Sequence, residues 1–467
     1  MRRFAFLVVL AGVLAVPVAV DAPRERGFYL APHQARDTVS QARSGGRAAS
    51  PTDQIDVSRL ATPQAETAVA VDPADANVLL GASGSFDATI AVFGSSDGGA
   101  TWTSSGLRPR GLCSFGDPAP AIDDAHRQFL AFLAAPCFQE RGRIRVALAT
   151  RPSSAAAWTT RVPAIPGKST FDDKEALAVD ASPASPHHGR LYLAFSRLAT
   201  KNGDLHVVLT HSDDGGTTWS PPVRVSGGAH VDETYPSVAV GAGGTVLVSW
   251  LTLDQRVFLD RSTDGGDHFG KDVLVTVAAQ LPSGFCHFGG TALPAQPKRC
   301  VAAAPLVTAD ATAARVYVTY GAAGSSGREQ NVYVSSYDAL SLAPLVAQRQ
   351  INPPDGAVTS DQFFPASAVD PSTGRLWACW YDTAGDRTRR RTRYTCSASS
   401  DGGATWAPPV RAAAVFSDET VRAATAFEYG DYAGLAVANG IAHPMWTDSR
   451  NLAKLGEEIY TTALQLP

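Results

Sequence analysis

The sequence is poor in charged residues, which make up 18% of its 467 positions and leave a formal net charge of −4 at pH 7. A nucleic-acid-binding surface needs a concentration of positive charge, so this balance gives no support for a DNA- or RNA-binding role. After residue 22 no apolar run is long enough to cross a membrane. The six cysteines show no CxxC spacing, which disfavours a metal site. We therefore expect no nucleic-acid partner, no cofactor and no bound metal.

The first 22 residues have the pattern of an export signal. Met1-Arg2-Arg3 precedes an apolar run over residues 4–20, and small residues at 20–22 offer a cleavage site. We predict a signal peptide over residues 1–22 and a secreted, monomeric protein. Because the run is long and contains Pro17, an uncleaved N-terminal anchor is the alternative. Residues 23–53 are rich in Arg, Gly, Ser and Pro without an apolar period, which predicts a disordered linker.

Glycine and proline are abundant, with 41 and 31 residues, as expected for many short strands joined by turns. One eight-residue pattern, SxDGGxxW with Phe allowed last, occurs at residues 95–102, 212–219, 262–269 and 399–406. Its chemistry is that of a hairpin turn. The Asp carboxylate can accept backbone N–H bonds, the two glycines supply positive φ, and the aromatic residue can pack back on the sheet.

This pattern resembles the Asp box of the sialidase or BNR-repeat β-propellers. The resemblance implies a propeller in which each box joins the third and outer strands of a blade, on the face away from the active site. It identifies a scaffold rather than a function, because one fold can host many activities.

A larger repeat surrounds the boxes and contains an inner, a second and a third strand. Seven units are visible, with small-residue inner strands at 68–72, 118–123, 176–180, 236–241, 305–310, 365–370 and 434–437. Small side chains suit strands crowded around a central axis. The seventh unit lacks an outer strand, and residues 54–61 form an unassigned strand before the first unit. We predict an all-β propeller domain over residues 54–467, with seven four-stranded blades closed by the N-terminal strand and six blades as the alternative.

The cysteines of an exported chain are expected to form disulfides, and six cysteines allow fifteen connectivities. The positions of the cysteines in the repeat favour sequential pairing. Cys379 and Cys396 fall on the second and third strands of the sixth unit, so they can face each other across a hairpin. The other predicted pairs are Cys113 with Cys137, and Cys286 with Cys300, which bracket an insertion between the fourth and fifth units.

Polar residues gather in the loops that lead into the inner strands and in those that leave the second strands. These loops are predicted on one face, at the mouth of the central channel. The candidate catalytic residues are Glu428, Tyr429, Tyr432, Asp431, Asp232 and Glu233, and the candidate substrate-binding residues are Arg197, Arg450, Asp173 and Tyr235. The alternative interpretation is structural, with the carboxylates accepting backbone N–H bonds or pairing with arginines.

The resemblance implies a mechanism for this rim. Sialidases bind a sugar carboxylate with three arginines, use a tyrosine activated by a glutamate as nucleophile, and protonate the leaving group with an aspartate. On that basis Glu428 with Tyr429 or Tyr432 forms the nucleophile pair, and Arg197 and Arg450 bind the carboxylate. Two features depart from the family. The Phe/Tyr-Arg-Ile-Pro motif is absent, since residues 56–60 read DVSRL, and catalytic sialidase domains have six blades.

The leading functional hypothesis is a glycoside hydrolase related to exo-α-sialidases that acts on a glycan or glycoconjugate. One alternative is a lyase on acidic polysaccharide, with His230, His287 or a tyrosine as base and the arginine-rich loop at 387–393 as a cationic lip. The other is a propeller that binds a glycan or protein without catalysis. The missing arginine motif counts against a true sialidase and favours the alternatives.

Overall fold

The computed structural model describes residues 40–43, 54–60, 62–137, 144–164, 170–199, 201, 203–227, 232–282, 290–355, 358–422, 427–450 and 456–466. The predicted signal peptide lies outside this part of the chain. Within the predicted linker the structure describes one short strand, β1 (Ser40–Arg43), which pairs antiparallel with β6. None of the helices in the described ranges has the length and apolar character needed to span a bilayer.

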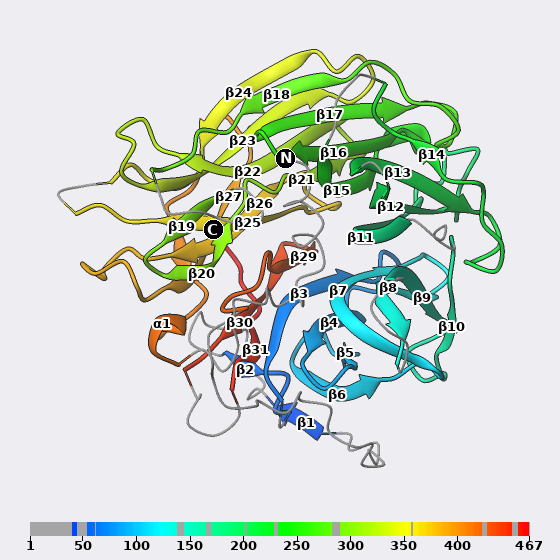
Figure 1. Cartoon of the computed structure of the whole chain (residues 1–467), viewed down its shortest axis with the longest axis horizontal. Helices are drawn as coiled ribbons and strands as arrows, with labels where there is room; N and C mark the ends of the chain where they lie inside the picture. The colour runs from blue at the N-terminus through cyan, green and yellow to red at the C-terminus, as the bar shows by residue number, and fades with distance from the viewer. Residues whose placement is uncertain are drawn as a thin grey trace.

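The chain forms seven four-stranded antiparallel blades arranged in a ring (Figure 1). The inner strands are β3 (Gln64–Val71), β7 (Leu112–Ile122), β11 (Thr170–Val179), β15 (Glu233–Val240), β21 (Leu306–Asp310), β25 (Gln362–Val369) and β29 (Gly434–Ala438). The second strands are β4 (Leu79–Ser85), β8 (Gln128–Pro136), β12 (Leu191–Ala199), β16 (Val246–Thr252), β22 (Arg315–Ala323), β26 (Leu376–Asp382) and β30 (Ile441–Asp448). The seven-bladed propeller predicted from the repeat is confirmed.

The outer half of each blade consists of a third and an outer strand. The third strands are β5 (Ile90–Ser95), β9 (Arg145–Arg151), β13 (Asp204–Ser212), β17 (Arg256–Ser262), β23 (Gln330–Asp338), β27 (Arg393–Ser399) and β31 (Glu458–Thr461). The outer strands are β6 (Thr101–Leu107), β10 (Thr159–Arg161), β14 (Val223–Arg224), β18 (Val273–Val277), β24 (Pro344–Gln350), β28 (Val410–Arg411) and β2 (Ile55–Asp56). A hairpin of β19 (Thr291–Leu293) and β20 (Gln296–Val301) is inserted between the fourth and fifth blades, and a short helix, α1 (Glu419–Arg422), precedes the seventh.

The hydrophobic core lies between neighbouring blades, where the second and third strands present apolar side chains to both faces. Leu191, Tyr192, Leu193, Ala194 and Phe195 of β12 are all fully buried, as expected for a strand covered on both sides. Each inner strand packs beside the inner strand of the next blade, and β29 packs against β3. The strands therefore form a closed ring.

The ring closes through the N-terminal strand, as predicted. Strand β2 pairs with β31 in the register Ile55 to Thr461, and the Val57 N–H donates to the Ile459 carbonyl at 2.9 Å. The side chains of Ile55 and Val57 are buried. Gly434 lets β29 approach β3 closely, since a side chain there would lie 2.9 Å from the Cα of Ala68. The first and last segments of the domain thus share one blade.

The four SxDGGxxW turns, called the box turns below, join the third and outer strands of the first, third, fourth and sixth blades. In the first, the Thr101 N–H donates to Asp97 Oδ1 at 2.8 Å, and Gly98 and Gly99 have φ of 68° and 83°. Trp102 is buried and its indole N–H donates to the Gly99 carbonyl at 3.0 Å. These bonds confirm the predicted turn chemistry.

Replacing Asp401 by Ala should lower stability without touching the channel mouth. The Asp401 carboxylate accepts bonds from the Thr405 N–H at 2.9 Å and the Thr405 hydroxyl at 2.6 Å. These bonds outweigh the effect of burial and hold the pKa of Asp401 low, at about 2. We expect a loss of about 1–2 kcal/mol in the free energy of unfolding, measured by urea denaturation. Asp401→Asn keeps one acceptor oxygen and should lose less; an equal loss in both variants would contradict the assigned role.

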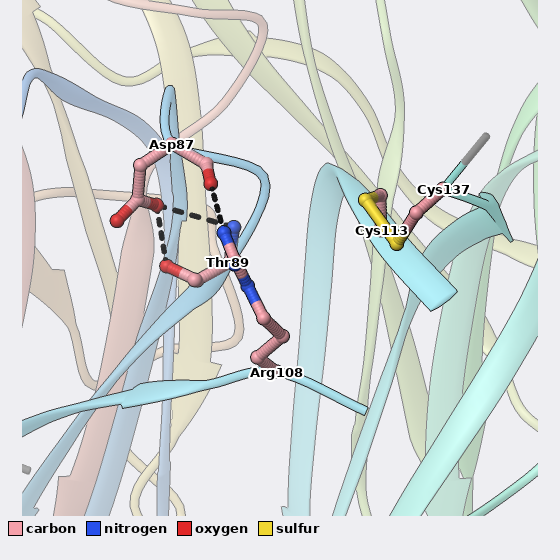
Figure 2. The surroundings of a disulfide bond; sticks show 5 residues. All are labelled: Asp87, Thr89, Arg108, Cys113 and Cys137. Atoms are coloured by element: carbon pink, nitrogen blue, oxygen red, sulfur yellow. Dashed lines mark hydrogen bonds between the residues drawn. A yellow bond between two sulfur atoms is a disulfide. The ribbon is translucent and has the colours of Figure 1, made fainter. Parts of the chain in front are cut away.

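Two of the three predicted disulfides are present. Cys379 and Cys396 stand directly opposite each other on β26 and β27 and are bonded. Cys113, at the start of β7, is bonded to Cys137, just after β8 (Figure 2). Cys286, the predicted partner of Cys300, lies outside the described residues, so that pair stays a prediction. All described cysteines are disulfide-bonded.

Candidate functional site

Five inner strands begin earlier than the sequence predicted and contain a β-bulge near their first residues. The bulges fall at Glu66, Asp117, Lys174, Tyr235 and Phe364, whose φ angles lie between 50° and 59°. Positive φ is unfavourable for residues with a Cβ atom, and bulges serve to re-aim side chains. Polar residues that we expected in loops therefore sit on strands, held in fixed directions.

Residues at these bulges come together with others to form a buried polar group, called the mouth cluster. Its members are Glu66, Asp117, Asp173, Lys174, Glu175, Tyr235, Arg299, Asp431 and Tyr432. They come from the first, second, third, fourth and seventh blades and from the inserted hairpin. They meet because the inner strands start at the same end of the ring.

Asp431 accepts three side-chain hydrogen bonds within the mouth cluster. Its carboxylate accepts from Arg299 Nε at 2.8 Å and Arg299 Nη2 at 2.7 Å, a bidentate pair, and from Lys174 Nζ at 2.7 Å. Lys174 also donates to Asp117 at 3.1 Å and lies 5.3 Å from the ring centre of Tyr235. The two cations outweigh the cost of burial and hold the pKa of Asp431 well below its usual range.

The inserted hairpin delivers Arg299 to the cluster. Backbone N–H groups of Lys298 and Arg299 donate to Glu428 Oε2 at 3.1 and 3.2 Å. The Gln296 amide donates to the Gly430 carbonyl at 2.8 Å, and Arg299 Nη2 reaches Glu66 at 2.8 Å. Gly430 has φ of 80°, and a Cβ there would clash with Glu66. The hairpin and the segment before β29 are thus built to fit one another.

Several carboxyl groups of the cluster favour the protonated form. Burial, opposed by Lys174 and reinforced by Asp117, raises the pKa of Asp173 to about 7. Burial also raises the pKa of Glu66 and of Glu175 well above the usual value, and the Asp117 charge adds to both shifts. Both carboxyl oxygens of Glu175 are buried and have no hydrogen-bond partner among the residues that the structure describes. Within the described ranges the cluster contains five carboxyl groups and two cations, so the carboxyl groups cannot all be ionised at low cost.

The stability of the protein should fall as pH rises from 5 to 8. A carboxyl group whose pKa is higher in the folded state than in the unfolded state stabilises the fold at a pH below its unfolded-state pKa. This contribution is lost as pH rises through the folded-state pKa, which is about 7 for Asp173. A tenfold difference in proton affinity between the folded and unfolded states is worth about 1.4 kcal/mol. Asp431, whose pKa is lowered, opposes this trend only under more acidic conditions. Melting temperatures across this range should fall less steeply in Asp173→Asn; parallel profiles would contradict the raised pKa.

The tyrosines of the cluster are poor candidates for ionisation. Burial, followed by the charge of Asp431, raises the pKa of Tyr235, and burial and the charge of Asp117 raise that of Tyr432. The Tyr432 hydroxyl donates to Asp117 Oδ1 at 3.4 Å. Both side chains can donate a hydrogen bond as neutral phenols, but the acidic surroundings oppose a phenolate.

Four of the predicted site residues belong to the mouth cluster, namely Asp173, Tyr235, Asp431 and Tyr432. Tyr429 points elsewhere: its side chain is fully buried against Phe363 and Tyr381, and its hydroxyl donates to the Ser417 carbonyl at 3.2 Å. Glu428 is likewise buried and holds the inserted hairpin through Oε2. The side chains of Glu428 and Tyr429, one of the two predicted nucleophile pairs, thus bond to different partners.

The remaining predicted residues make structural contacts. Glu233 is fully buried and accepts from the Val207 N–H at 3.1 Å and from Arg224 at 3.3 Å. Asp232 has φ of 64°, and its carbonyl accepts from Leu253. The two predicted substrate-binding arginines are paired with acids: Arg197 is bidentate to Asp172 at 2.7 and 2.8 Å, and Arg450 bonds to Asp448 at 2.5 Å and stacks on Tyr460.

Several arginines of the loop at 387–393 also make side-chain contacts within the protein. Arg389 is bidentate to Asp361, Arg391 bonds to Asp386, and Arg393 lies 3.9 Å from the ring centre of Phe416. Local contacts therefore hold these three arginines. His230 and His287, the candidate bases of the lyase hypothesis, lie outside the described residues.

Five members of the mouth cluster are not among the predicted site residues: Glu66, Asp117, Lys174, Glu175 and Arg299. Glu66 lies between the closing strand and the first predicted inner strand, in a stretch that reads TPQAET, and the first unit supplied no other acid at this position. Asp117 and Lys174 occupy the same position in the second and third units, so an alignment of the units at these residues could have located Glu66. Arg299 lies in the insertion, outside the repeat, next to Cys300. No periodic pattern points to it.

No family model and no curated protein matches the sequence. Solved structures match the fold at low identity. A polysaccharide lyase, an ulvan lyase bound to a GlcA-Rha3S chain, is 11% identical, with 88% of this chain and 96% of that one covered and a TM-score of 0.52. A Hadza microbial sialidase is 12% identical (84% and 75% covered, TM-score 0.44), and an arabinofuranosidase of Fusarium graminearum is 11% identical (88% and 97% covered, TM-score 0.45). The likeness to the ulvan lyase shows a shared fold.

Proposed function

We propose that this protein is an exported glycoside hydrolase whose reaction is carried by carboxyl groups of the mouth cluster. The proposal depends on one observation, that the pKa values of two carboxyl groups in the cluster are shifted in opposite directions. The pKa of Asp173 is raised to about 7, while that of Asp431 is lowered. Carboxyl groups whose environments push their pKa values apart are the usual basis for acid and base roles at one site. The disulfides and the predicted signal peptide support export.

The roles follow from the protonation states. Asp173 keeps its proton up to about neutral pH and is the proton donor to the leaving-group oxygen. Asp431 remains ionised between Lys174 and Arg299 and places negative charge near the oxocarbenium-like transition state. Tyr235 and Tyr432 are assigned as neutral hydrogen-bond donors to the sugar, because the raised pKa of each phenol opposes its use as a nucleophile.

The charge of the site favours a neutral glycan over a sialoside. Arg299 is engaged by Glu66 and Asp431, and Arg197 and Arg450 by their own acids. These three arginines are therefore not free to bind a sugar carboxylate. The two cations of the cluster, Lys174 and Arg299, are already engaged by acids of the cluster, so the site has no unbalanced positive charge to attract an acidic sugar. We therefore infer a substrate without charge at the cleaved residue.

A lyase on acidic polysaccharide is the second candidate. Its support is the meeting of Lys174, Arg299 and Tyr235 in one site, since such a lyase needs cations for the uronate carboxylate and a base for the adjacent proton. The ulvan lyase, which shares the fold, is a precedent for this chemistry on a propeller. The raised pKa of Tyr235 weighs against it as the base.

One screen separates the candidates. The purified mature protein is incubated with neutral oligosaccharides, sialosides and uronate polysaccharides, and products are followed by reducing-end release and by the ultraviolet absorbance of unsaturated sugars. The proposal expects new reducing ends from a neutral glycan without unsaturated product. Unsaturated product from uronates would replace it by the lyase, and release of sialic acid would restore the tyrosine mechanism. Absence of turnover on every class would favour a binding protein.

A further inference from the structure

A cavity lies between the first and second blades and shares no lining residue with the mouth cluster. Its volume is about 430 Å³, within the usual range for small-ligand sites. The turn that joins β6 to β7 forms one wall, and the outer strand β10 forms the other. The lining includes Arg108, Arg110, Trp158, Thr160 and Arg161. We call these five residues and the space between them the arginine cavity.

The three arginines of the cavity carry charge that no acid among the described residues offsets. Arg108 donates to the backbone carbonyl of Asp87 at 2.7 Å rather than to a carboxylate (Figure 2). Arg110 and Arg161 are exposed, and within the described ranges neither pairs with an acid. Most arginines near the channel mouth differ, since Arg197 and Arg299 each hold a carboxylate in a bidentate pair. The cavity therefore offers guanidinium groups ready to bind an anion.

An oriented indole completes the cavity. Trp158 packs partly buried against the core between the first two blades. The guanidinium of Arg151 lies 4.3 Å from its ring centre, and Arg151 is itself held by Gln128 through bonds of 2.8 and 2.6 Å. Burial lowers the pKa of Arg151 to about 10, which still leaves it charged at neutral pH. A fixed aromatic surface beside several cations can contact the apolar C–H face of a sugar ring while its acidic group is bound.

The wall that carries Arg108 and Arg110 is held by covalent and local constraints. The Leu112 N–H closes the turn onto the Pro109 carbonyl at 3.2 Å, and Gly111 has φ of 75°. Next in the chain is Cys113, whose disulfide with Cys137 links the start of β7 to the residue that follows β8 (Figure 2). A rigid wall lowers the entropy cost of binding.

We propose that the arginine cavity is an accessory site for an anionic oligosaccharide, in which Arg110 and Arg161 bind a sulfate or carboxylate group and Trp158 contacts the sugar ring. Exposed guanidinium groups without an ion pair among the described residues can bind an anion, and the indole and the cavity volume favour a sugar over an inorganic ion. A nucleic acid fits less well, because the protein carries net negative charge. The proposal does not depend on the hydrolase activity of the mouth cluster.

The test measures binding of labelled tetrasaccharides to the mature protein by fluorescence anisotropy at low salt. Chondroitin sulfate and unsulfated hyaluronan tetrasaccharides distinguish sulfate from carboxylate recognition, and cellotetraose and oligo(dT) are the neutral and nucleic-acid probes. The variant Arg110→Ala/Arg161→Ala should lose about tenfold or more in affinity for the acidic tetrasaccharides, because it removes two charge-assisted contacts. Trp158→Phe should also bind more weakly while keeping an aromatic ring against Arg151.

The matched control is Arg328→Ala/Arg349→Ala, which removes the same charge from two exposed arginines of the fifth blade. Its affinity should stay within about twofold of the original protein. Three results would overturn the proposal: no binding of either acidic tetrasaccharide, an equal loss in the control, or tighter binding of oligo(dT) or of inorganic sulfate than of the tetrasaccharides. Turnover at the mouth cluster should be the same in both double variants.

Discussion

Replacing Asp173 by Asn should reduce turnover by about 10²- to 10⁴-fold, because an amide of the same shape cannot donate the proton that general acid catalysis requires. The fold should persist, since Asp173 is only one of several acids in a crowded cluster and its charge is unfavourable there. The measurement is kcat on the substrate found in the screen, together with the melting temperature. In the unaltered protein the activity should decline as pH rises through about 7, where Asp173 loses its proton.

Asp172→Asn is the matched control for this variant. Asp172 is adjacent in sequence and equally buried, but it holds Arg197 through two hydrogen bonds and takes no part in the mouth cluster. Its replacement should lower the melting temperature while the folded fraction keeps its activity. Full activity in Asp173→Asn, or an equal loss in both variants, would remove Asp173 from the mechanism.

Removing the closing strand should cost about 5 kcal/mol or more in the free energy of unfolding. Ile55 and Val57 are buried, and each such side chain contributes about 1.5–3 kcal/mol. The backbone bond between Val57 and Ile459, and the bond from the Ile459 N–H to the Ser58 hydroxyl, add about 1 kcal/mol each. This loss is comparable to the whole stability of many domains.

The comparison that isolates the strand uses two shortened chains. A chain that starts at residue 54 keeps β2 and should unfold at nearly the same urea concentration as the full chain. A chain that starts at residue 61 lacks it and should unfold at a much lower concentration or aggregate through the exposed edge of β31. If both chains unfold alike, β2 does not close the ring in solution.

The repeat made the architecture predictable. Each blade uses the same local chemistry, and the box turns repeat one set of hydrogen bonds around Asp97, Asp214, Asp264 and Asp401. These hydrogen bonds join residues within a few positions of one another, so a short sequence pattern is enough to predict them. The closing strand was found in the same way, as the one strand missing from a regular series.

The site was less predictable because its contacts join residues far apart in the chain. Arg299 lies outside the repeat, yet it bonds to Asp431 and Glu66. The bulge at Glu66 interrupts the alternation of a strand, so the sequence does not reveal where its side chain points. Tyr429 and Tyr432 are three residues apart and look alike in sequence, but one enters the aromatic core and the other faces Asp117. Only the three-dimensional packing distinguishes them.

The seam between the first and last blades has a consequence for how the protein matures. Glu66 lies on β3, the inner strand of the first blade, and Asp431 belongs to the last blade, so Arg299 can bind both only after the whole domain has been synthesised and the ring has shut. Contacts so distant in sequence form late in folding. A nascent or proteolytically shortened chain would therefore hold most of its blades but no assembled acid cluster. Catalytic competence would then appear as a final, all-or-none event, and its appearance would report ring closure directly.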